Sequence, residues 1–546
     1  MEPTPHYKAY KPKPFTKEQR KDTTLLFGGL TWKHERLIQG AFHNLNYKAE
    51  PLPNITRADL DTGKELIDVG ACCPTIFTTG NLVNYLKKKK EEEGKEAAVN
   101  DYAYFTMGAC GPCRFGQYRE SYSMALDGIG LRDFRMFFLS QTELNQGDQE
   151  GGGLEVNMPL TTGIVWAILI GDLLTDLEFQ TRPYEVVPGQ TNIVLKECIE
   201  IMYQAFKNRP IDKIKGNKWL TLGWHVVSNY FTDALKEVIA KWKTIEVNKA
   251  QAKPMVKITG EFWLQTHEGD GNYNIKDWLE KEGAEVIPPP VAVWLDYLMQ
   301  FPLHALNERK NVDKGTKKKI LMLKGMIKMY HWTYNRMRKS LNEMPYEMPS
   351  QKTLAELAAP YFNFRLDGGE GHMLIGKALY AYLNNKAHMT CELTPYSCMP
   401  NTMSVGAMAN VRGKYPELLY APIEIKGDAE IHALSRCQMI LTEAKKRALK
   451  EYDEVMKKCN MTPEKLEWIA LNAPEYKEAS FKVPHNGYAG TGANYITMLS
   501  QYKGKLTKTL KKTATVTPKP IAAETVLTEV AATETVTVQE PELTYA

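Results

Sequence analysis

The segment 108–118 (Gly-Ala-Cys-Gly-Pro-Cys-Arg-Phe-Gly-Gln-Tyr) contains two cysteines and three glycines. The aromatic run Tyr102–Phe105 before it is typical of a short buried strand. After it, apolar residues recur at three- and four-residue spacing from Phe115 to Ile129, which predicts an amphipathic helix. Cys113 is therefore expected between a strand and a helix. At such a position, unpaired backbone N–H groups and the positive end of the helix dipole stabilise a thiolate or an anionic cluster bound to it.

Three cysteines share one pattern, in which a cysteine lies within two residues of a proline, after a predicted strand and before a predicted helix: Cys72, Cys113 and Cys398. Loops that leave the carboxyl ends of parallel strands gather at one edge of a sheet, so three such thiols can meet. Soft thiolates select zinc or iron–sulfur clusters. Structural zinc sites use closely paired ligands, whereas these cysteines are far apart in the chain, so a cluster between two domains is favoured.

The other six cysteines are interpreted differently. The candidates for a fourth or additional ligand are Cys73, Cys110, Cys391 and Cys437. Each of these by itself is more typical of a core thiol. Cys198 lies in an amphipathic segment and is expected to be buried, and Cys459 is expected to be an isolated thiol. The odd total of nine cysteines favours free thiols or metal ligands over a disulfide framework.

The sequence Cys110-Gly-Pro-Cys113 supports a second interpretation, because Cys-Gly-Pro-Cys is the active dithiol of thioredoxins. Ala109 and Arg114 flank it, however, where thioredoxins have Trp and usually Lys, and 546 residues are several times too many for that family. A thiol–disulfide oxidoreductase that uses Cys110 and Cys113 is thus the alternative to the cluster hypothesis.

Arg114 directly follows Cys113 and is a candidate cofactor-binding residue. Its guanidinium can offset the charge of a cluster or donate to sulfide, which would raise the reduction potential, although a surface or capping role fits the position equally well. His372 and His388 near the third motif are more typical of structural histidines. The candidates for a proton donor, among which the sequence indicates no preference, are Glu370, Glu392 and Glu424.

Length and composition limit the function classes. A chain of 546 residues is too long for one core and predicts two or three domains. The net charge of +5 is small and the lysines are dispersed, which disfavours nucleic-acid binding. The beginning of the chain has no apolar region typical of a secretory signal, and the longest apolar run is Ile164–Ile170, whereas a membrane span needs roughly 20 residues. We therefore expect no membrane association and a cytoplasmic location.

Strand and helix patterns alternate as in an α/β fold. We predict two Rossmann- or flavodoxin-like domains with helical insertions, and the cluster site in the interdomain cleft. The predicted boundaries are an extended arm at 1–20, a first α/β domain with a helical extension at 21–250, a second α/β domain with a helical insertion at 251–504, and a disordered tail at 505–546. The predicted extended segments are Thr24–Phe27, Ala49–Leu52, Leu66–Val69, Tyr102–Phe105, Met255–Trp263 and Leu418–Ile425, and the predicted helices include 32–45, 275–281, 402–411 and 431–450.

Several segments resemble motifs of one known family. Cys72–Leu86 resembles the Cys-x-Pro…Thr-Thr-Gly…Tyr-Leu motif of the acyl-CoA dehydratase activase-related proteins, which are cousins of 2-hydroxyacyl-CoA dehydratase and benzoyl-CoA reductase subunits. Gly111–Tyr118, preceded by Tyr104-Phe105, resembles that family's most specific motif, and Pro395–Pro400 is similar to its Pro-Phe-x-Cys-Met-Pro segment. The start of its second α/β unit also resembles Met255–Trp263 and the later Glu280-x-x-Gly283. The resemblance extends over most of residues 20–450.

The resemblance implies iron–sulfur ligation by Cys72, Cys113 and Cys398, in a [4Fe-4S] cluster or a double-cubane cluster. It implies an oxygen-sensitive reductase or dehydratase component that passes low-potential electrons to a difficult substrate, for which an acyl-CoA is a candidate. Larger members of the family carry ATPase modules, and this chain has neither such a module nor a Gly-x-x-x-x-Gly-Lys-Ser/Thr motif, so a separate ATP-hydrolysing activase is the expected partner. A homodimer remains open, and a non-catalytic iron–sulfur electron-transfer or scaffold protein is a further alternative.

Overall fold

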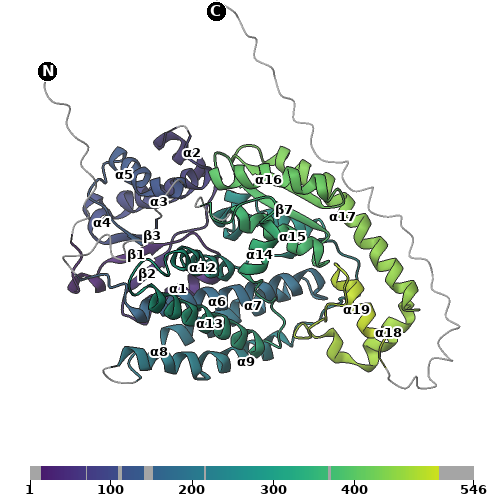
Figure 1. The fold of residues 1–546 in the computed structure, drawn as a ribbon. Helices are drawn as coiled ribbons and strands as arrows, with labels where there is room; N and C mark the ends of the chain where they lie inside the picture. The colour runs from purple at the N-terminus through teal and green to yellow at the C-terminus, as the bar shows by residue number, and fades with distance from the viewer. Residues whose placement is uncertain are drawn as a thin grey trace, which may run out of the picture. The chain divides into compact units, whose positions relative to one another are not determined.

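The computed structural model describes residues 14–68, 70–108, 113–139, 152–213, 217–366 and 371–502. Within these ranges two four-stranded sheets organise the chain, and their strands pair in parallel (Figure 1). The predicted α/β fold with two parallel sheets is therefore confirmed. The strands are β1 Thr24–Phe27, β2 Lys48–Pro51, β3 Tyr102–Met107, β4 Arg135–Leu139, β5 Met255–Gly260, β6 Glu285–Ile287, β7 Met389–Pro395 and β8 Leu419–Ile425.

Helices connect and cover these strands. In the first half of the chain they are α1 Trp32–His43, α2 Arg57–Leu66, α3 Cys73–Glu93, α4 Lys95–Asn100, α5 Tyr118–Gly128, α6 Met158–Thr181, α7 Gln190–Lys207, α8 Lys218–Val227 and α9 Tyr230–Trp242. In the second half they are α10 Phe262–Thr266, α11 Ile275–Lys281, α12 Val291–Glu308, α13 Thr316–Ser340, α14 Gln351–Ala358, α15 Gly371–Leu383, α16 Met399–Lys414, α17 Glu430–Lys458, α18 Pro463–Asn472 and α19 Thr491–Leu499. Short 3-10 helices are η1 Glu18–Lys21, η2 Arg114–Gln117, η3 Arg182–Tyr184, η4 Asp270–Asn272 and η5 Pro474–Lys477.

The two sheets have the same topology. The strand order is β2-β1-β3-β4 in the first sheet and β6-β5-β7-β8 in the second, so the first strand of each half is central and the next two lie on either side of it. The chain therefore reverses its direction of winding between β1 and β3, and again between β5 and β7. At such a reversal, an open α/β sheet leaves a crevice at the carboxyl ends of its strands.

The central strands are buried on both faces, as parallel sheets require. All four residues of β1 are buried, as are the first four of β3 and the first five of β7. Strand β7 also contains Thr390, Glu392 and Thr394, whereas the side chains of β1, β3 and β8 are mostly apolar. This continuous apolar pattern explains why β1, β3 and β8 lie where the sequence predicts strands.

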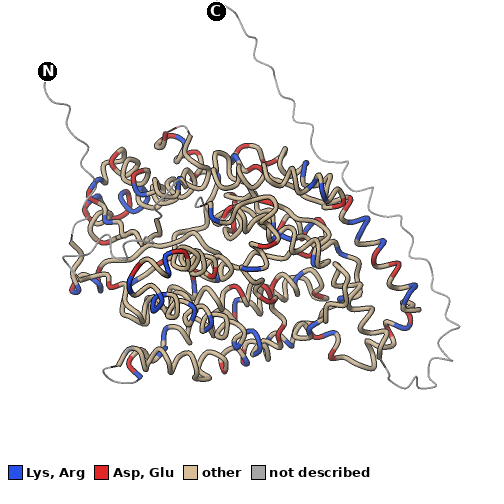
Figure 2. Tube along the Cα trace, in the orientation of Figure 1, with Lys and Arg blue, Asp and Glu red and all other residues tan. Residues whose placement is uncertain are grey.

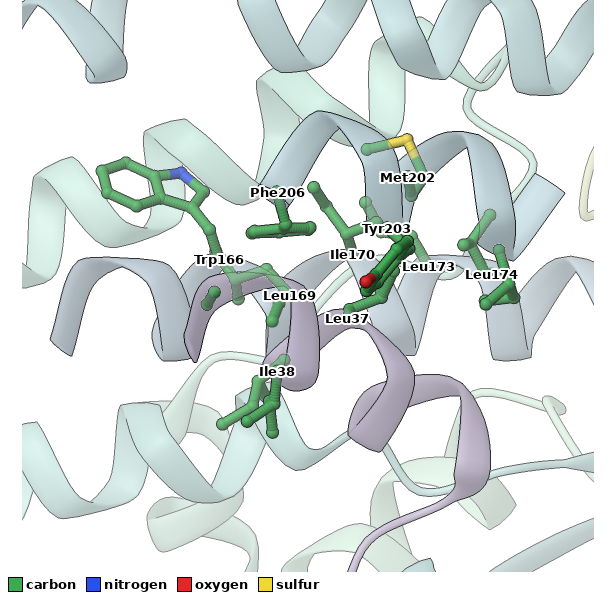
Figure 3. Packing of buried hydrophobic residues seen from close by; sticks show 14 of the residues in the cluster. Leu37, Ile38, Trp166, Leu169, Ile170, Leu173, Leu174, Met202, Tyr203 and Phe206 are labelled. Carbon is green, nitrogen blue, oxygen red and sulfur yellow. The ribbon is translucent and has the colours of Figure 1, made fainter. Parts of the chain in front are cut away.

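Two helical insertions complete the fold, α6 to α9 after β4 and α12 to α14 after β6. The largest apolar core gathers along α6, where Leu169 and Leu173 pack with Leu37 of α1 and Phe206 of α7 (Figure 3). Val291 at the start of α12 belongs to the same core. The two halves of the chain therefore share one core.

Helix α6 is unusually apolar. Within the described residues, the stretch Met158–Tyr184 is long and apolar enough to cross a membrane by length and composition, and 67% of its most apolar window is buried inside the protein. It contacts α1, α7 and α12, as a core helix does. Figure 2 shows Lys, Arg, Asp and Glu interspersed along the other helices.

The predicted strand at Leu66–Val69 is wrong. Helix α2 ends at Leu66, and Val69 lies outside the described residues. This helix begins with a capping box. The side chain of Thr56 bonds the backbone of Asp59, and the side chain of Asp59 accepts a hydrogen bond from Thr56 N. Such a Thr-x-x-Asp signature marks the start of a helix, and it was the available sequence signal. Cys72 therefore follows a helix and a short loop instead of a strand.

Two further segments differ in part from their predictions. The strand predicted at Met255–Trp263 ends at Gly260, because Glu261 caps α10 by accepting from Leu264 N at 2.9 Å. At the end of the predicted 1–20 arm, Phe15 is fully buried, and Glu18–Lys21 form a 3-10 helix. Residues 1–13 and the predicted tail at 505–546 lie outside the described residues, and the domain boundaries stay predictions.

Candidate functional site

A cavity of about 240 Å³ lies where the carboxyl ends of the central strands of both sheets meet. Its wall includes Phe27 at the end of β1, Met107 at the end of β3, Glu261 after β5 and Pro395 at the end of β7. These four strands flank the winding reversals of the two sheets, where ligands of open α/β sheets bind. The crevices of the two sheets thus open into a single cavity.

The cavity brings the three predicted cysteines together. Cys72, Cys113 and Cys398 all belong to its wall, although hundreds of residues separate the first from the last. Each of them is also the N-cap residue of a helix, Cys72 of α3, Cys113 of η2, which leads into α5, and Cys398 of α16. Three helix N-termini therefore direct their partial positive charge toward thiols of the same cavity, which favours an anionic group held by them.

The Cys-x-Pro spacing has a local explanation. Pro74 and Pro400 both occupy the first turn of the helix that follows the cysteine. A proline is tolerated there because the first N–H groups of a helix have no intrahelical partner, and its ring presets the helical backbone angle. The proline thus starts the helix and leaves the cysteine as the capping residue at its end.

Two hydroxyl groups contact the thiol of Cys72. Its Sγ lies 2.9 Å from Thr75 Oγ1 and 3.7 Å from the Tyr118 hydroxyl. Burial raises the pKa of the Cys72 thiol, and the hydrogen bonds from Thr75 and Tyr118 only oppose that rise. An uncompensated thiolate is therefore disfavoured here, whereas bound metal would deprotonate the thiol outright. These groups fit a metal ligand better than a free nucleophile.

Cys398 is held by a buried polar network. Its thiol donates to Asn401 Oδ1 at 3.4 Å, and Asn401 donates to Glu392 Oε1 at 3.1 Å. Ser404 and Tyr420 also donate to Glu392, at 2.8 and 2.7 Å. Burial raises the pKa of Glu392, which is fully buried. This candidate proton donor lies behind the cavity wall, where it orients Asn401 and the start of α16.

The three cysteine-bearing loops are bonded to one another. Arg114 and Ser397 both donate to the carbonyl oxygen of Gly70, the latter at 3.4 Å, and Cys73 N donates to Tyr396 O at 3.4 Å. Gly70 has a φ of 105°, which favours glycine. The predicted cofactor-binding Arg114 belongs to the cavity wall and ties the loop before Cys72 to the loop of Cys113. It therefore fixes the relative positions of these two cysteines.

The remaining predicted residues do not share the cavity. In the described part of the chain, its wall contains none of the thiols Cys73, Cys198, Cys391, Cys437 and Cys459. Cys391 and Cys437 are fully buried against each other in the core of the second sheet, and Cys198 is buried beside α6. Glu424 is paired with Lys426 at 3.3 Å and is about half exposed. Cys110 and Glu370 lie outside the described residues.

The two predicted histidines have structural contacts. His388 accepts a hydrogen bond from Met255 N at 2.9 Å and pairs with Glu451 at 3.4 Å. His372 lies against the ring of Tyr297, and burial lowers its pKa to about 4. Neither belongs to the cavity wall. The prediction that they are structural agrees with these positions.

Sequence reasoning missed the two carboxyl groups and the imidazole of the wall, which belong to Glu35, Glu261 and His267. Burial raises the pKa of Glu35 to about 8. Two sequence signals indicate that a helix begins directly after β1. They are a Gly-Gly pair and the N-cap threonine Thr31, whose side chain accepts a hydrogen bond from His34 N. Most of the wall is apolar and aromatic, with residues such as Phe42, Phe105, Phe115, Trp263 and Trp294. The cavity thus suits a compact apolar group beside the thiols.

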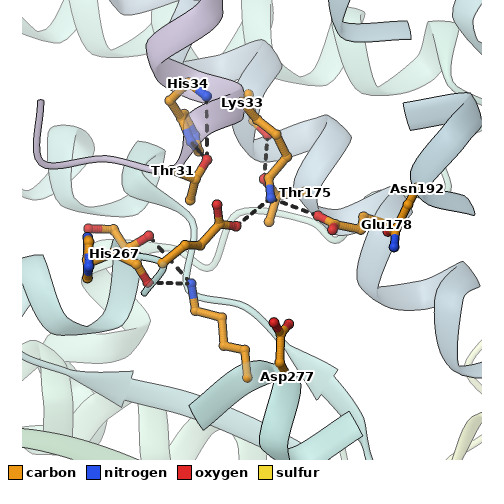
Figure 4. Close-up of polar contacts among 12 residues, drawn as sticks. Thr31, Lys33, His34, Thr175, Glu178, Asn192, His267 and Asp277 are labelled. Carbon is orange, nitrogen blue, oxygen red and sulfur yellow. Dashed lines mark hydrogen bonds and ion pairs between the residues drawn. The ribbon is translucent and has the colours of Figure 1, made fainter. Parts of the chain in front are cut away.

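A second, more polar cavity of about 340 Å³ adjoins the first, and Asn54 and His267 belong to both walls. Beside it, Lys33 is fully buried and pairs with Glu178 at 2.9 Å and Glu268 at 2.6 Å (Figure 4). His267 stacks on Trp263 with 4.5 Å between ring centres, and its Nε2 has no hydrogen-bond partner in the described residues. Burial lowers the pKa of His267 to about 3, so its imidazole is neutral.

The donor set fits a cluster better than a single ion. Among the described residues, no three His, Cys, Asp or Glu side chains converge closely enough to hold one metal ion. A cubane cluster offers a different iron to each thiolate, so its ligands surround a volume instead of one point. Three thiols around a cavity are the arrangement that such a cluster needs. In comparisons with known proteins, no family model and no curated protein matches this chain.

Proposed function

We propose that this protein is an iron–sulfur reductase component whose Cys72, Cys113 and Cys398 hold a [4Fe-4S] cluster or part of a double-cubane cluster. It accepts low-potential electrons from a separate ATP-hydrolysing activase and passes them to a substrate in the cavity. The observation that carries this proposal is that three cysteines, far apart in the chain, cap three helices around one cavity. Helix N-termini and soft thiolates together favour an anionic cluster.

The surroundings support electron transfer to a bound substrate. The cluster would supply one-electron reduction at low potential, while this chain's own groups bind the substrate and exclude water. The aromatic wall provides an apolar binding surface, and Arg114 places a positive charge beside the thiols. An acyl-CoA remains the candidate substrate class, on the resemblance of the cysteine motifs alone.

The resemblance of the cysteine motifs implies a separate activase. One common phosphate-binding loop combines glycines with a following Lys and Ser or Thr. The glycine-rich segment that ends at Gly153 continues instead with Leu-Glu-Val. We therefore place ATP hydrolysis on a second protein in this proposal.

The test begins with protein purified without oxygen, which should be brown and contain about four irons per chain, or about eight with a double cluster. Reduced activase and MgATP should then reduce the cluster, followed by electron paramagnetic resonance, and omission of nucleotide should abolish the reduction. Colourless protein that contains stoichiometric zinc would contradict the proposal that the cysteines hold a redox-active iron–sulfur cluster. Equally fast reduction without nucleotide would leave a plain electron-transfer or scaffold protein.

The alternative is a thiol–disulfide oxidoreductase, and the Cys110-Gly-Pro-Cys113 sequence is the observation that favours it. In that case a thioredoxin-type reductant should reduce a disulfide in iron-free protein. Cys72→Ala and Cys398→Ala should then leave the activity unchanged. Loss of iron in those two variants points to the cluster instead.

A further inference from the structure

We propose that Glu35 is the proton-binding group of the cysteine-lined cavity, and that in alkaline solution, where it is ionised in the oxidised protein, its carboxylate takes up one proton for each electron that the cluster accepts. The inference rests on the proposed function, because it needs a reducible cluster at the three cysteines, and it goes further by assigning the proton to one carboxyl. One electron from the low-potential reductant and one proton from solvent convert the oxidised cluster and a Glu35 carboxylate into the reduced cluster and a carboxylic acid.

The position of Glu35 supports this role. It belongs to α1 and to the wall that contains the cysteines, and its side chain is only 7% exposed. Its Oε1 accepts a hydrogen bond from Leu30 N at 3.2 Å, in the turn that follows β1. Within the described residues no Lys, Arg or His side chain is bonded to this carboxyl. A negative charge at Glu35 would thus be buried without a cation, which favours the protonated form.

The residues around Glu35 determine the pKa of its carboxyl group. Burial raises its pKa to about 8; the charge of Glu268 adds to the rise, and hydrogen bonds from the backbone of Leu30 and Gly29 oppose it. Lys33, on the same helix, forms its ion pairs with two other carboxylates and not with Glu35. The titratable groups around it are Lys33 and His34 on α1, Tyr104 on β3, and Glu261, His267 and Glu268 around α10. An electron added at the thiols of the same cavity wall makes this carboxylate more basic, so proton uptake at Glu35 accompanies reduction of the cluster.

A path for the proton adjoins the site. The polar cavity shares His267 and Asn54 with the cysteine-lined cavity, and its wall includes the exposed Asn192 and Asp277, so it reaches solvent. His267 is 4% exposed and its Nε2 has no partner in the described chain. A neutral imidazole can accept a proton at one nitrogen and release one from the other. His267 is thus the wall residue through which a proton can enter.

The test is a redox titration of the anaerobically purified holoprotein between pH 7 and pH 10. Above the carboxyl's pKa in the oxidised state, the wild-type midpoint should fall by about 59 mV for each tenfold drop in proton activity, as one proton per electron requires. Glu35→Gln keeps the size of the side chain and an acceptor for Leu30 N but cannot ionise. Its midpoint should therefore not change with pH. A reduced-minus-oxidised infrared spectrum at pH 9 should show a protonated carboxyl in the wild type and none in this variant.

Glu261→Gln is the matched control, because it removes the other carboxyl of the same wall. It should keep the wild-type dependence of the midpoint on pH. A dependence that persists in Glu35→Gln, or that disappears in Glu261→Gln instead, would overturn the assignment to Glu35. Wild-type protein without iron would overturn the proposed function, so the two failures are distinguishable. Iron content equal to wild type in Glu35→Gln shows that the variant has folded.

Discussion

Cys72, Cys113 and Cys398 differ from the other described thiols in two respects, because each is the N-cap residue of a helix and each belongs to the cavity wall. A buried thiol such as Cys198 has neither property, and burial raises its pKa to about 12. At the scale of the residue, this contrast separates the proposed ligands from thiols that only pack in the core. Removing a proposed ligand would remove a corner of the cluster, while removing a core thiol costs only packing.

Cys72→Ala, Cys113→Ala and Cys398→Ala should each lose most of the iron, measured by metal analysis of anaerobically purified protein. Cys198→Ala is the control and should retain wild-type iron, since its thiol is buried in the core and lies outside the cavity wall. Its stability should fall modestly, by about 1 kcal/mol. Equal iron content in all four variants would rule out this ligand set.

Glu35 also makes a prediction about stability and pH. The unfolded chain releases the proton near the ordinary carboxyl pKa of 4.5, whereas the folded protein holds it until about pH 8. Its contribution is therefore fully present below pH 4.5 and is lost as pH rises to 8, by an amount on the order of a few kcal/mol. Glu35→Gln lacks this loss, so its melting temperature relative to wild type should rise between pH 5 and pH 9. Parallel curves for the two proteins would contradict the burial of this carboxyl.

At the scale of the element, α3 is positioned by close contact with α2. A Cβ added at Gly80 would lie 1.7 Å from the backbone oxygen of Asp59, and one at Gly63 would lie 2.1 Å from that of Ile76. The two helices thus pack backbone against backbone, which only glycine permits. This contact fixes the start of α3 and therefore the place of Cys72.

Gly80→Ala should consequently lower the free energy of unfolding by roughly 1–3 kcal/mol or more, because the helices must separate. The matched control is Gly325→Ala on the exposed part of α13, where no atom lies within 4 Å of the added Cβ. That change should stabilise the helix by up to about 1 kcal/mol. Urea denaturation of both variants measures the difference. A Gly80→Ala protein as stable as wild type would show that the helices lie farther apart.

At the scale of the whole molecule, the two halves are joined by buried charges. Lys33 of α1 pairs with Glu178 of α6 and with Glu268, which follows α10. Asp172 of α6 accepts from the backbone of Val291 and Ala292 at the start of α12, at 2.9 and 2.7 Å. These bonds hold the crevices of the two sheets against each other, and the cavity depends on them.

Lys33→Ala should lower the free energy of unfolding by roughly 3–5 kcal/mol, because it leaves two carboxylates without their buried cation. Lys236→Ala removes an exposed lysine that pairs with Asp233 at 2.8 Å, and should cost at most about 1 kcal/mol. Denaturant unfolding compares the two. A small decrease in the free energy of unfolding in both variants would mean that the ion pairs of Lys33 do not hold the two halves of the chain together.

The sequence by itself determined the local patterns. The apolar strands β1 and β3 lie where they were predicted, and so does the amphipathic helix α11 at Ile275–Lys281. Their apolar patterns depend only on residues that are close in the sequence. The strand–cysteine–helix pattern at Cys113 and Cys398 is local in the same way. The capping box of α2 is also a local signal, and it explains why the segment predicted as a strand from Leu66 begins inside a helix.

Only the tertiary structure decided which of these residues meet. The order of strands in each sheet brings the ends of β1, β3, β5 and β7 to one cavity, and no spacing along the chain encodes that order. Glu35 has an ordinary place in the first turn of an amphipathic helix, and it shares the cavity wall with segments distant in sequence, such as Leu52 and Trp263. A pKa depends on the solvent and charges around a group, and packing between distant segments sets both.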